Sequence, residues 1–210
     1  MIKAILWDND GLLVDTERIY FEANRQVLLR AGVELTKQLF ADVSLRQGLS
    51  LLDLARRSGW KGKQLAALRQ ERDAYYLELL QTGVRVLPGV EATLRALRGK
   101  ARMGIVTSAQ RVHFDAMHTR SGLLPHFEFV ITREDYAHGK PAPDGYLEGL
   151  RRLGVDPVEC LAVEDSERGL VSAVAAGIRC IVVPNAESAG GDFASALAVL
   201  PEVSRLPDFL

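Results

Sequence analysis

Short apolar runs recur along the chain with helical patterns between them, and this alternation restricts the possible folds more than any other feature of the sequence. The runs are Ile2 to Trp7, Arg102 to Val106, Phe127 to Ile131, Cys160 to Val163 and Arg179 to Val183. Runs that are apolar throughout indicate strands buried on both faces, as in a parallel sheet with helices on each side. The sequence therefore predicts an α/β fold with a doubly wound, Rossmann-like parallel sheet and right-handed crossovers.

One long segment interrupts this alternation. Between residues 16 and 83 no run is typical of a strand, and helical patterns cover Arg18 to Arg30, Leu49 to Arg57 and Gln64 to Leu80. A segment of this length is too long for an ordinary connection within one domain. We expect residues 16–83 to form an inserted all-helical cap domain, and residues 1–15 and 84–210 to form the core. The charge-rich stretch "RQERDAYYLELL" in the insert is interpreted as a solvated helix face.

The overall composition and charge restrict the kinds of partner that the protein is expected to bind. Hydrophobic residues make up 48% of the 210 residues, which is enough for a sizeable core, and the net charge is −1. Lysine and arginine are scattered, so the chain shows no basic surface for nucleic acid or an anionic membrane. No apolar run approaches the ~20 residues of a membrane span, and the residues after Met1 lack the charged n-region and cleavage site typical of a signal peptide. We expect a cytoplasmic monomer that binds a small molecule, with Cys160 and Cys180 as core thiols.

Polar side chains follow most of the predicted strands. In an open parallel sheet, ligands bind beyond the carboxyl ends of the strands, so these side chains are expected to meet at one edge. They are Asp8, Asn9 and Asp10 after the first strand, Thr107 and Ser108 after the second, Lys140 after the third, and Glu164 and Asp165 after the fourth.

The acidic residues of this set predict a metal site. Carboxylates that lie close together repel one another and resist burial unless a cation neutralises them. Mg²⁺ prefers oxygen ligands and commonly takes one or two carboxylates together with a substrate phosphate. Asp8 and Asp165 suit such an ion.

The same residues indicate phosphoryl transfer. Beside a cation, Asp8 can stay ionised and attack a phosphoryl group to give an aspartyl phosphate. Lys140 and the Thr107 hydroxyl would then stabilise charge in the transition state. Asp10, two residues further on, can protonate the leaving group and later deprotonate the attacking water.

Four motifs occur in an order that resembles the haloacid dehalogenase superfamily, in its phosphatase branch with a helical cap. They are "DNDGLLVDTE", Thr107-Ser108, Lys140 in "GKPAPDGY", and "VEDSERGL". The resemblance implies Asp8 as nucleophile and Asp10 as general acid and base. It also implies Mg²⁺ bound by Asp8, the main-chain carbonyl of Asp10, and Asp165 with Glu164 beside it. The implied phosphate contacts are the Thr107 hydroxyl, the Lys140 ammonium and main-chain amides near Asn9 and Ser108.

Within the superfamily, the chain is most similar to β-phosphoglucomutase-like proteins and sugar-phosphate phosphatases. Their cap carries a "GxSxxD" loop that faces the active site, and residues 48–53 match it. Gly48 and Ser50 are therefore candidate substrate contacts, although Ser50 could instead cap the helix that follows. The true mutases have an arginine after the loop serine and a histidine shortly after the first motif, where this chain has Leu51 and Tyr20. Arg46 could reach in instead.

The predicted function is thus a Mg²⁺-dependent phosphatase for a small phosphorylated metabolite, with a sugar phosphate as the expected substrate and a phosphomutase as the alternative. Two other classes of protein are alternatives to a phosphatase. A phospho-accepting signalling module would lack the D-x-D arrangement and the helical insert, and a dehalogenase would not need the acidic cluster. The four histidines show no metal-ligand spacing and are expected at the surface or behind the site.

Overall fold

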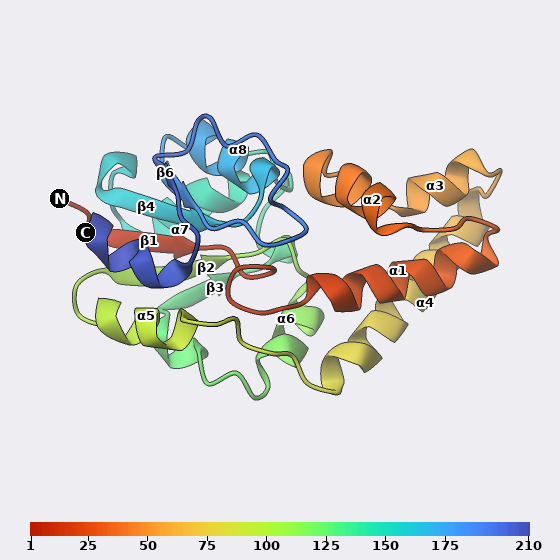
Figure 1. The fold of residues 1–210 in the computed structure, drawn as a ribbon, viewed down its shortest axis with the longest axis horizontal. Coiled ribbons are helices and arrows are strands. Elements are labelled where there is room, and N and C mark those ends of the chain that lie inside the picture. Colours follow the sequence, from red (N-terminus) through yellow and green to blue (C-terminus); the bar gives the residue numbers. More distant parts are fainter.

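The computed structural model describes residues 1–210, except for the side chain of Leu45. Its centre is a parallel sheet of six strands in the order β3-β2-β1-β4-β5-β6 (Figure 1). The strands are β1 (Ala4–Trp7), β2 (Arg102–Val106), β3 (Phe129–Ile131), β4 (Cys160–Glu164), β5 (Arg179–Val182) and β6 (Ala198–Val199). The doubly wound parallel sheet that the sequence predicts is confirmed. The short edge strand β6 was not predicted.

Helices cover both faces of the sheet. One face carries α5 (Val90–Leu97), α6 (Arg111–His118) and a C-terminal 3₁₀ segment (Val203–Phe209), and the other carries α7 (Asp144–Leu153) and α8 (Glu167–Ala175). Shorter 3₁₀ turns span Leu124–His126, Arg133–Asp135 and Pro157–Glu159. Successive residues of β1 alternate between the two cores: Ile5 and Trp7 pack on the α5 side, Ala4 and Leu6 on the other. All four are fully buried, as expected for a central parallel strand.

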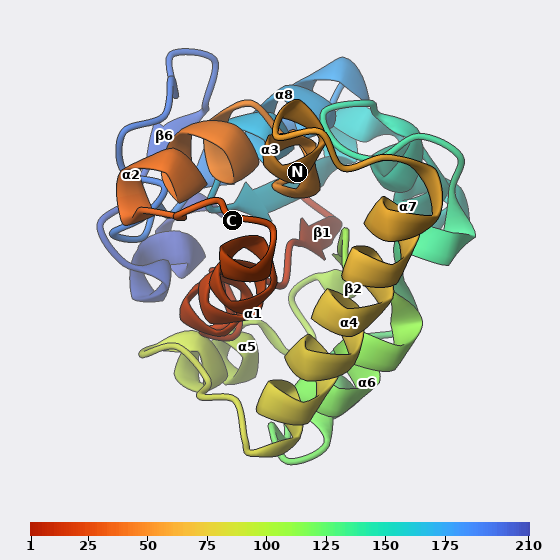
Figure 2. The ribbon, with the colours of Figure 1, turned by 90° about the vertical axis from the view of Figure 1, so that its right-hand side faces the viewer.

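The segment between β1 and β2 is helical. It contains α1 (Glu17–Arg30), α2 (Lys37–Phe40), a π-helical turn (Ala41–Arg46), α3 (Leu52–Arg57) and α4 (Gly62–Gln81). These helices have an apolar core of their own, to which Val27, Phe40 and Leu51 contribute. In Figure 1 they lie at the end of the molecule opposite to both chain termini, and Figure 2 looks onto them, with α1 and α4 side by side. We refer to these helices as the cap. The cap boundaries at residues 16 and 83 remain a prediction.

The two segments that link the cap to the core run next to each other. Val14 and Val86 form an antiparallel bridge, and the Asp15 amide donates to the Arg85 carbonyl at 2.9 Å. Paired connections of this kind leave the cap attached at one place, beside the loop that follows β1. Among the described residues, no helix has the length and apolar character needed to cross a membrane.

Candidate active site

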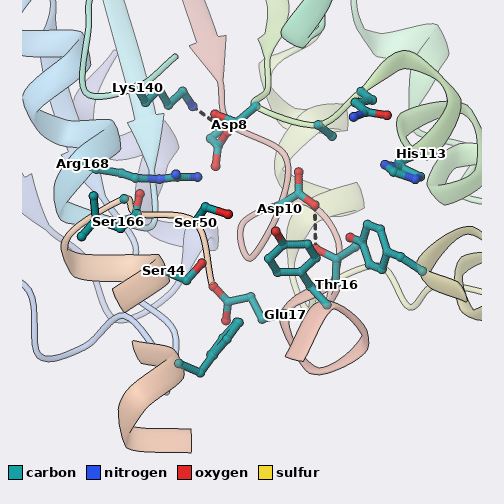
Figure 3. Close-up of a pocket in the computed structure, with 18 of the residues that line it drawn as sticks. Asp8, Asp10, Thr16, Glu17, Ser44, Ser50, His113, Lys140, Ser166 and Arg168 are labelled. Atoms are coloured by element: carbon teal, nitrogen blue, oxygen red, sulfur yellow. Dashed lines mark hydrogen bonds and ion pairs between the residues drawn. The ribbon is translucent and has the colours of Figure 1, made fainter. Parts of the chain in front are cut away.

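A cavity of about 380 Å³ lies between the carboxyl edge of the sheet and the cap. Core loops bring Asp8, Asp10, Ser108, Lys140 and Asp165 to its wall, so these residues, predicted from the sequence, do lie together. Figure 3 shows Asp8, Asp10 and Lys140 across the cavity from cap side chains that include Ser44 and Ser50. The cap contributes residues that include Glu17, Tyr20, Gly48, Ser50 and Arg72.

Lys140 lies at the floor of the cavity and is almost completely buried. Its Nζ donates to Asp8 Oδ1 at 2.7 Å, to Glu164 Oε1 at 2.6 Å and to the Val106 carbonyl at 3.0 Å, so all three of its hydrogens have acceptors (Figure 3). Burial alone would lower the pKa of Lys140, but the charges of Asp8 and Glu164 and their hydrogen bonds raise it above its ordinary value. Lys140 is therefore a permanent positive charge beside Asp8.

The Glu164 carboxylate points into the core and not into the cavity. It is fully buried, and the Tyr146 hydroxyl donates to the same Oε1 at 2.6 Å. A Cβ added to Gly169, in the first turn of α8, would collide with this carboxylate. The helix can begin above Glu164 only because residue 169 has no side chain. Glu164 is thus a counter-ion for Lys140, with a carboxylate oxygen still within reach of the other acidic groups.

Gly169→Ala is expected to destabilise the fold by about 3 kcal/mol, because the new methyl group must displace a buried, paired carboxylate. Urea unfolding of the variant would measure this loss. Val171→Ala, an exposed change on the same helix, is the control and should stay within about 0.5 kcal/mol of the wild type. Equal stability of the two variants would show that Glu164 is not confined as described.

The acidic residues fit a hard cation. One carboxylate oxygen from each of Asp8, Glu164 and Asp165 lies within 4.8 Å of the others. Burial, together with the charges of Glu17, Asp8 and Glu164, raises the pKa of Asp165 well above its ordinary value. One lysine faces these three buried carboxylates, so a divalent cation with oxygen ligands would relieve their repulsion.

The turn after Asp10 lets the backbone approach Asp165. Gly11 has φ +76°, and an added Cβ would lie 2.5 Å from Asp165 Oδ2 and 2.6 Å from Asn185 Nδ2. Asn185 Nδ2 in turn donates to Asp165 Oδ2 at 2.9 Å and to the Gly11 carbonyl at 3.2 Å. A glycine is required both by this positive φ and by the close contact. The loop that carries Asp8 and Asp10 is thereby held against the loop that carries Asp165.

Asp10 is half-buried, and both of its carboxylate oxygens accept hydrogen bonds. Oδ1 accepts from Thr16 Oγ1 at 2.8 Å (Figure 3), and Oδ2 accepts from Thr107 Oγ1 at 3.0 Å and from Asn9 Nδ2 at 3.2 Å. Thr107, predicted to bind phosphate, is fully buried and bonds to Asp10 here. Ser108 has a buried Oγ with no hydrogen-bond partner among the described residues, and it lines the cavity. Such an orphaned hydroxyl fits an anionic ligand.

The predicted cap residues separate into two groups. Gly48 and Ser50 line the cavity. The alternative interpretation of Ser50 as a helix cap is wrong, because α3 begins after Leu51 without a side-chain cap. Arg46 does not line the cavity: its Nη1 pairs with Asp42 at 2.7 Å, and its guanidinium lies against Gly190.

Several residues that line the cavity were missed at the sequence level. The stretch "RQERDAYYLELL" was interpreted as a solvated helix face, and this is wrong in part, because Arg72 and Tyr76 face the cavity. Arg72 Nη1 donates to the Tyr20 hydroxyl at 2.7 Å. Arg168 of "VEDSERGL" also lines the cavity and points into it (Figure 3).

Glu17 was also missed, although it ends the first motif. Burial raises its pKa to about 7, opposed by a hydrogen bond from Asn185 and assisted by the charges of Glu187 and Asp10. It lies on the cap side of the cavity (Figure 3).

His118, at the end of α6, is buried behind the cavity. Its Nε2 lies 2.7 Å from Asn9 Oδ1 and its Nδ1 lies 2.8 Å from Ser121 Oγ. Burial lowers the pKa of His118 to about 4, although the charge of Asp115 opposes the shift. The imidazole is therefore neutral near pH 7, and both of its ring nitrogens are already bonded to protein groups.

Stability should depend on pH through His118. Its pKa is about 4 in the folded chain and 6.5 ordinarily, so between these values the unfolded chain binds more protons. Lowering the pH from 6.5 to 4 is expected to cost up to about 3 kcal/mol of unfolding free energy, and no more is lost below pH 4. Urea unfolding at several pH values gives the unfolding free energy as a function of pH. Across this window, that free energy should change less steeply with pH in His118→Gln than in the wild type. Identical slopes would mean that His118 is not buried in its neutral form.

Comparison with known proteins agrees with this arrangement. The model of the haloacid dehalogenase-like hydrolase family matches residues 5–183. Protein CbbY of Rhodobacter capsulatus is 32% identical over 214 residues, which cover 97% of this chain and 94% of that protein. Hexitol phosphatase B of Escherichia coli is 30% identical over 190 residues, which cover 89% and 86% of the two chains.

A solved structure supports the same assignment. The crystal structure of CbbY from Rhodobacter sphaeroides in complex with phosphate has a TM-score of 0.80 at 25% identity, over 98% of this chain and 96% of that one. The family match spans most of the chain and includes Asp8, Lys140 and Asp165. The chain therefore belongs to the haloacid dehalogenase-like hydrolases, as an enzyme of the phosphatase type.

Proposed function

We propose that the protein is a Mg²⁺-dependent phosphomonoesterase that acts on a small phosphorylated metabolite through an aspartyl phosphate on Asp8. The observation that carries this proposal is the position of the Asp8 carboxylate, which lies in the cavity wall with Lys140 Nζ at 2.7 Å. A nucleophilic carboxylate must be ionised and must face its substrate. The contact with the Lys140 ammonium supports the first condition, and the place of Asp8 in the cavity wall supports the second.

In the first step, Asp8 attacks phosphorus, and the bond between phosphorus and the ester oxygen breaks. Asp10 protonates that oxygen as it leaves. In the second step, Asp10 takes a proton from water, which attacks the phosphorus of the aspartyl phosphate and releases inorganic phosphate and free Asp8. The Lys140 ammonium and the orphaned Ser108 hydroxyl stabilise the charge on the phosphoryl oxygens, and the Asn9 and Ser108 amides are further candidate donors.

Mg²⁺ would be held by the carboxylates of Asp8 and Asp165 and by the Asp10 carbonyl. Glu164 is a further carboxylate within reach, although Lys140 and Tyr146 already use one of its oxygens. When bound, the ion would supply positive charge at this edge of the sheet, which would lower the repulsion between Asp8 and an anionic phosphate ester.

The relatives support a sugar phosphate or a related polyol phosphate as substrate, because one of them is named a hexitol phosphatase. Phosphomutase activity is the second candidate, and the cap disfavours it. Leu51, at the position of the mutase arginine, is buried in the cap core, and Arg46 lies outside the cavity. One chain supplies every residue named for the site, which supports a monomer as the active unit. A cap over residues 16–83 and a cytoplasmic location are further parts of this proposal.

Phosphate release from a panel of sugar, polyol and glycerol phosphates, with Mg²⁺ and with EDTA, tests this function. We expect Mg²⁺-dependent release from at least one member. Full activity in EDTA, or no release from any member, would contradict the proposal. Inclusion of β-glucose 1-phosphate with a bisphosphate primer tests the mutase alternative, which predicts glucose 6-phosphate and no net phosphate.

A further inference from the structure

We propose that His118 is a positioning residue for Asp10 and acts on it through the side chain of Asn9. This inference rests on the proposed function, because it assigns the way in which the general acid and base is held. Three hydrogen bonds carry it, and they run from the C-terminal end of α6 to the cavity wall. They join Ser121 Oγ to His118 Nδ1 at 2.8 Å, His118 Nε2 to Asn9 Oδ1 at 2.7 Å, and Asn9 Nδ2 to Asp10 Oδ2 at 3.2 Å.

The direction of these hydrogen bonds follows from Asp10. Asp10 Oδ2 accepts from Asn9 Nδ2 and from Thr107 Oγ1, so the Asn9 amide presents its NH₂ group to Asp10 and its Oδ1 to His118. Oδ1 in turn requires a hydrogen on His118 Nε2. Because the imidazole is neutral, its Nδ1 then accepts from the Ser121 hydroxyl, whose oxygen accepts from the Leu123 amide at 3.2 Å. Every donor points toward Asp10, an arrangement in which hydrogen bonds reinforce one another.

The surroundings hold this chain of hydrogen bonds rigidly. Asn9 is fully buried, and its Nδ2 also lies 3.3 Å from Met117 Sδ. The Asn9 carbonyl accepts from the amides of Leu13 at 2.8 Å and Val14 at 3.2 Å, so the same residue fixes the turn on which Asp10 lies. A buried amide that is held at both ends cannot rotate without leaving a polar group unpaired, at a considerable cost in free energy.

Asp10 therefore has three side-chain donors, from Thr16, Thr107 and Asn9, and the Asn9 side chain is in turn bonded to His118, which does not line the cavity. Thr16 begins the connection to the cap, so its contact can change when the cap moves. The contact from Asn9 is anchored in the core through His118. This core anchor would keep Asp10 aligned with the leaving-group oxygen in both steps of the reaction.

Two aryl esters separate positioning of the acid from a general loss of structure. Phenyl phosphate and p-nitrophenyl phosphate have similar shapes, but phenolate is a poor leaving group that needs a proton, and p-nitrophenolate leaves without one. The value of kcat/KM reports the step that forms the aspartyl phosphate. Its ratio for the two esters therefore measures how much the general acid contributes, whatever the fraction of folded enzyme.

The variants are chosen to differ only in the hydrogen bond. His118→Leu fills the space without a donor, and His118→Gln places an amide NH₂ close to the position of Nε2. Ser121→Ala removes the donor to Nδ1 at a half-buried position and serves where His118→Leu does not fold. Leu94→Ala is the control for lost stability alone. Leu94 lies on α5 and belongs to the apolar core that also contains Phe114, a residue of the same helix as His118, but it makes no hydrogen bond in this chain of contacts.

We expect His118→Leu to lower kcat/KM about 10-fold more for phenyl phosphate than for p-nitrophenyl phosphate, since small misplacements of a catalytic group have effects of this order or larger. His118→Gln should recover most of the difference, Ser121→Ala should show a smaller loss in the same direction, and Leu94→Ala should leave the ratio unchanged.

Equal losses on both esters in His118→Leu, or no recovery in His118→Gln, would overturn the inference and leave the proposed function intact. If the wild type with Mg²⁺ cleaves neither ester and releases phosphate from no member of the sugar, polyol and glycerol phosphate panel, the proposed function is wrong and the inference falls with it.

Discussion

Asp8→Asn is expected to abolish turnover, with a loss of at least ~10⁴-fold in kcat, the scale seen when a covalent nucleophile is removed. The amide is a poor nucleophile, but its Oδ1 can still accept from Lys140, and Lys140 keeps its ion pair with Glu164 at 2.6 Å. The variant should therefore fold. Phosphate release with Mg²⁺ measures the loss, and thermal unfolding confirms that the chain is intact.

Deamidation of the new asparagine would restore the wild-type residue, so mass spectrometry of the assayed sample is the necessary control. Near-full activity in a sample with the asparagine intact would exclude Asp8 as the nucleophile. Water would then attack the substrate directly, and the mechanism proposed above would be wrong.

Asp10→Asn is expected to lower kcat by at least ~10²-fold, as general acid and base catalysis usually contributes this much or more. Phosphate binding should persist, because Lys140 and Ser108 are untouched. With p-nitrophenyl phosphate, whose leaving group needs no proton, the first step should stay faster than the second. A burst of p-nitrophenol followed by slow turnover is the expected signature, measured by stopped-flow absorbance.

Asp15→Asn is the matched control. Asp15 lies in the same motif, but its carboxylate pairs with the exposed Arg85 at 2.9 Å, away from the cavity. Such a surface pair contributes little to stability, so the variant should retain wild-type activity and show no burst. Similar losses in Asp10→Asn and Asp15→Asn would mean that the charge of the loop matters, and not proton transfer by Asp10.

The sequence was sufficient to predict the core of the fold. Strands that are buried on both faces are apolar throughout, and helices between them can only cross over such a sheet. β6 could not be predicted in this way, because its two residues pair only with Ile181 and Val182 at the sheet edge. Its formation depends on that tertiary contact and not on a local pattern.

The site was predictable where residues directly follow strands. Asp8, Lys140 and Asp165 meet because parallel strands end at one edge. The inward direction of Glu164 follows from strand alternation, since Glu164 lies on the same side of β4 as Ala162, which packs against α7 and α8. The sequence contains this signal, and the grouping of Glu164 with Asp165 obscured it.

The remaining site residues depend on contacts between distant parts of the chain. Arg72 faces the cavity because α4 packs beside α1, and no local pattern in "RQERDAYYLELL" reveals which side of the helix that is. His118 lies 109 residues from Asn9 in sequence, and a single histidine on an apolar helix face is ordinarily a packing residue. Only the assembled fold shows its bond to the asparagine between the two aspartates.

Chemical identification of the phosphorylated residue would show whether Asp8 is the nucleophile. Asp10→Asn would be mixed with p-nitrophenyl phosphate and Mg²⁺, quenched in acid during slow turnover, and treated with borohydride, which reduces an acyl phosphate to an alcohol. We expect the peptide containing residue 8 to carry homoserine in place of Asp8. An unmodified Asp8 in enzyme that has released a stoichiometric burst of p-nitrophenol, or a modification at another residue, would contradict this assignment.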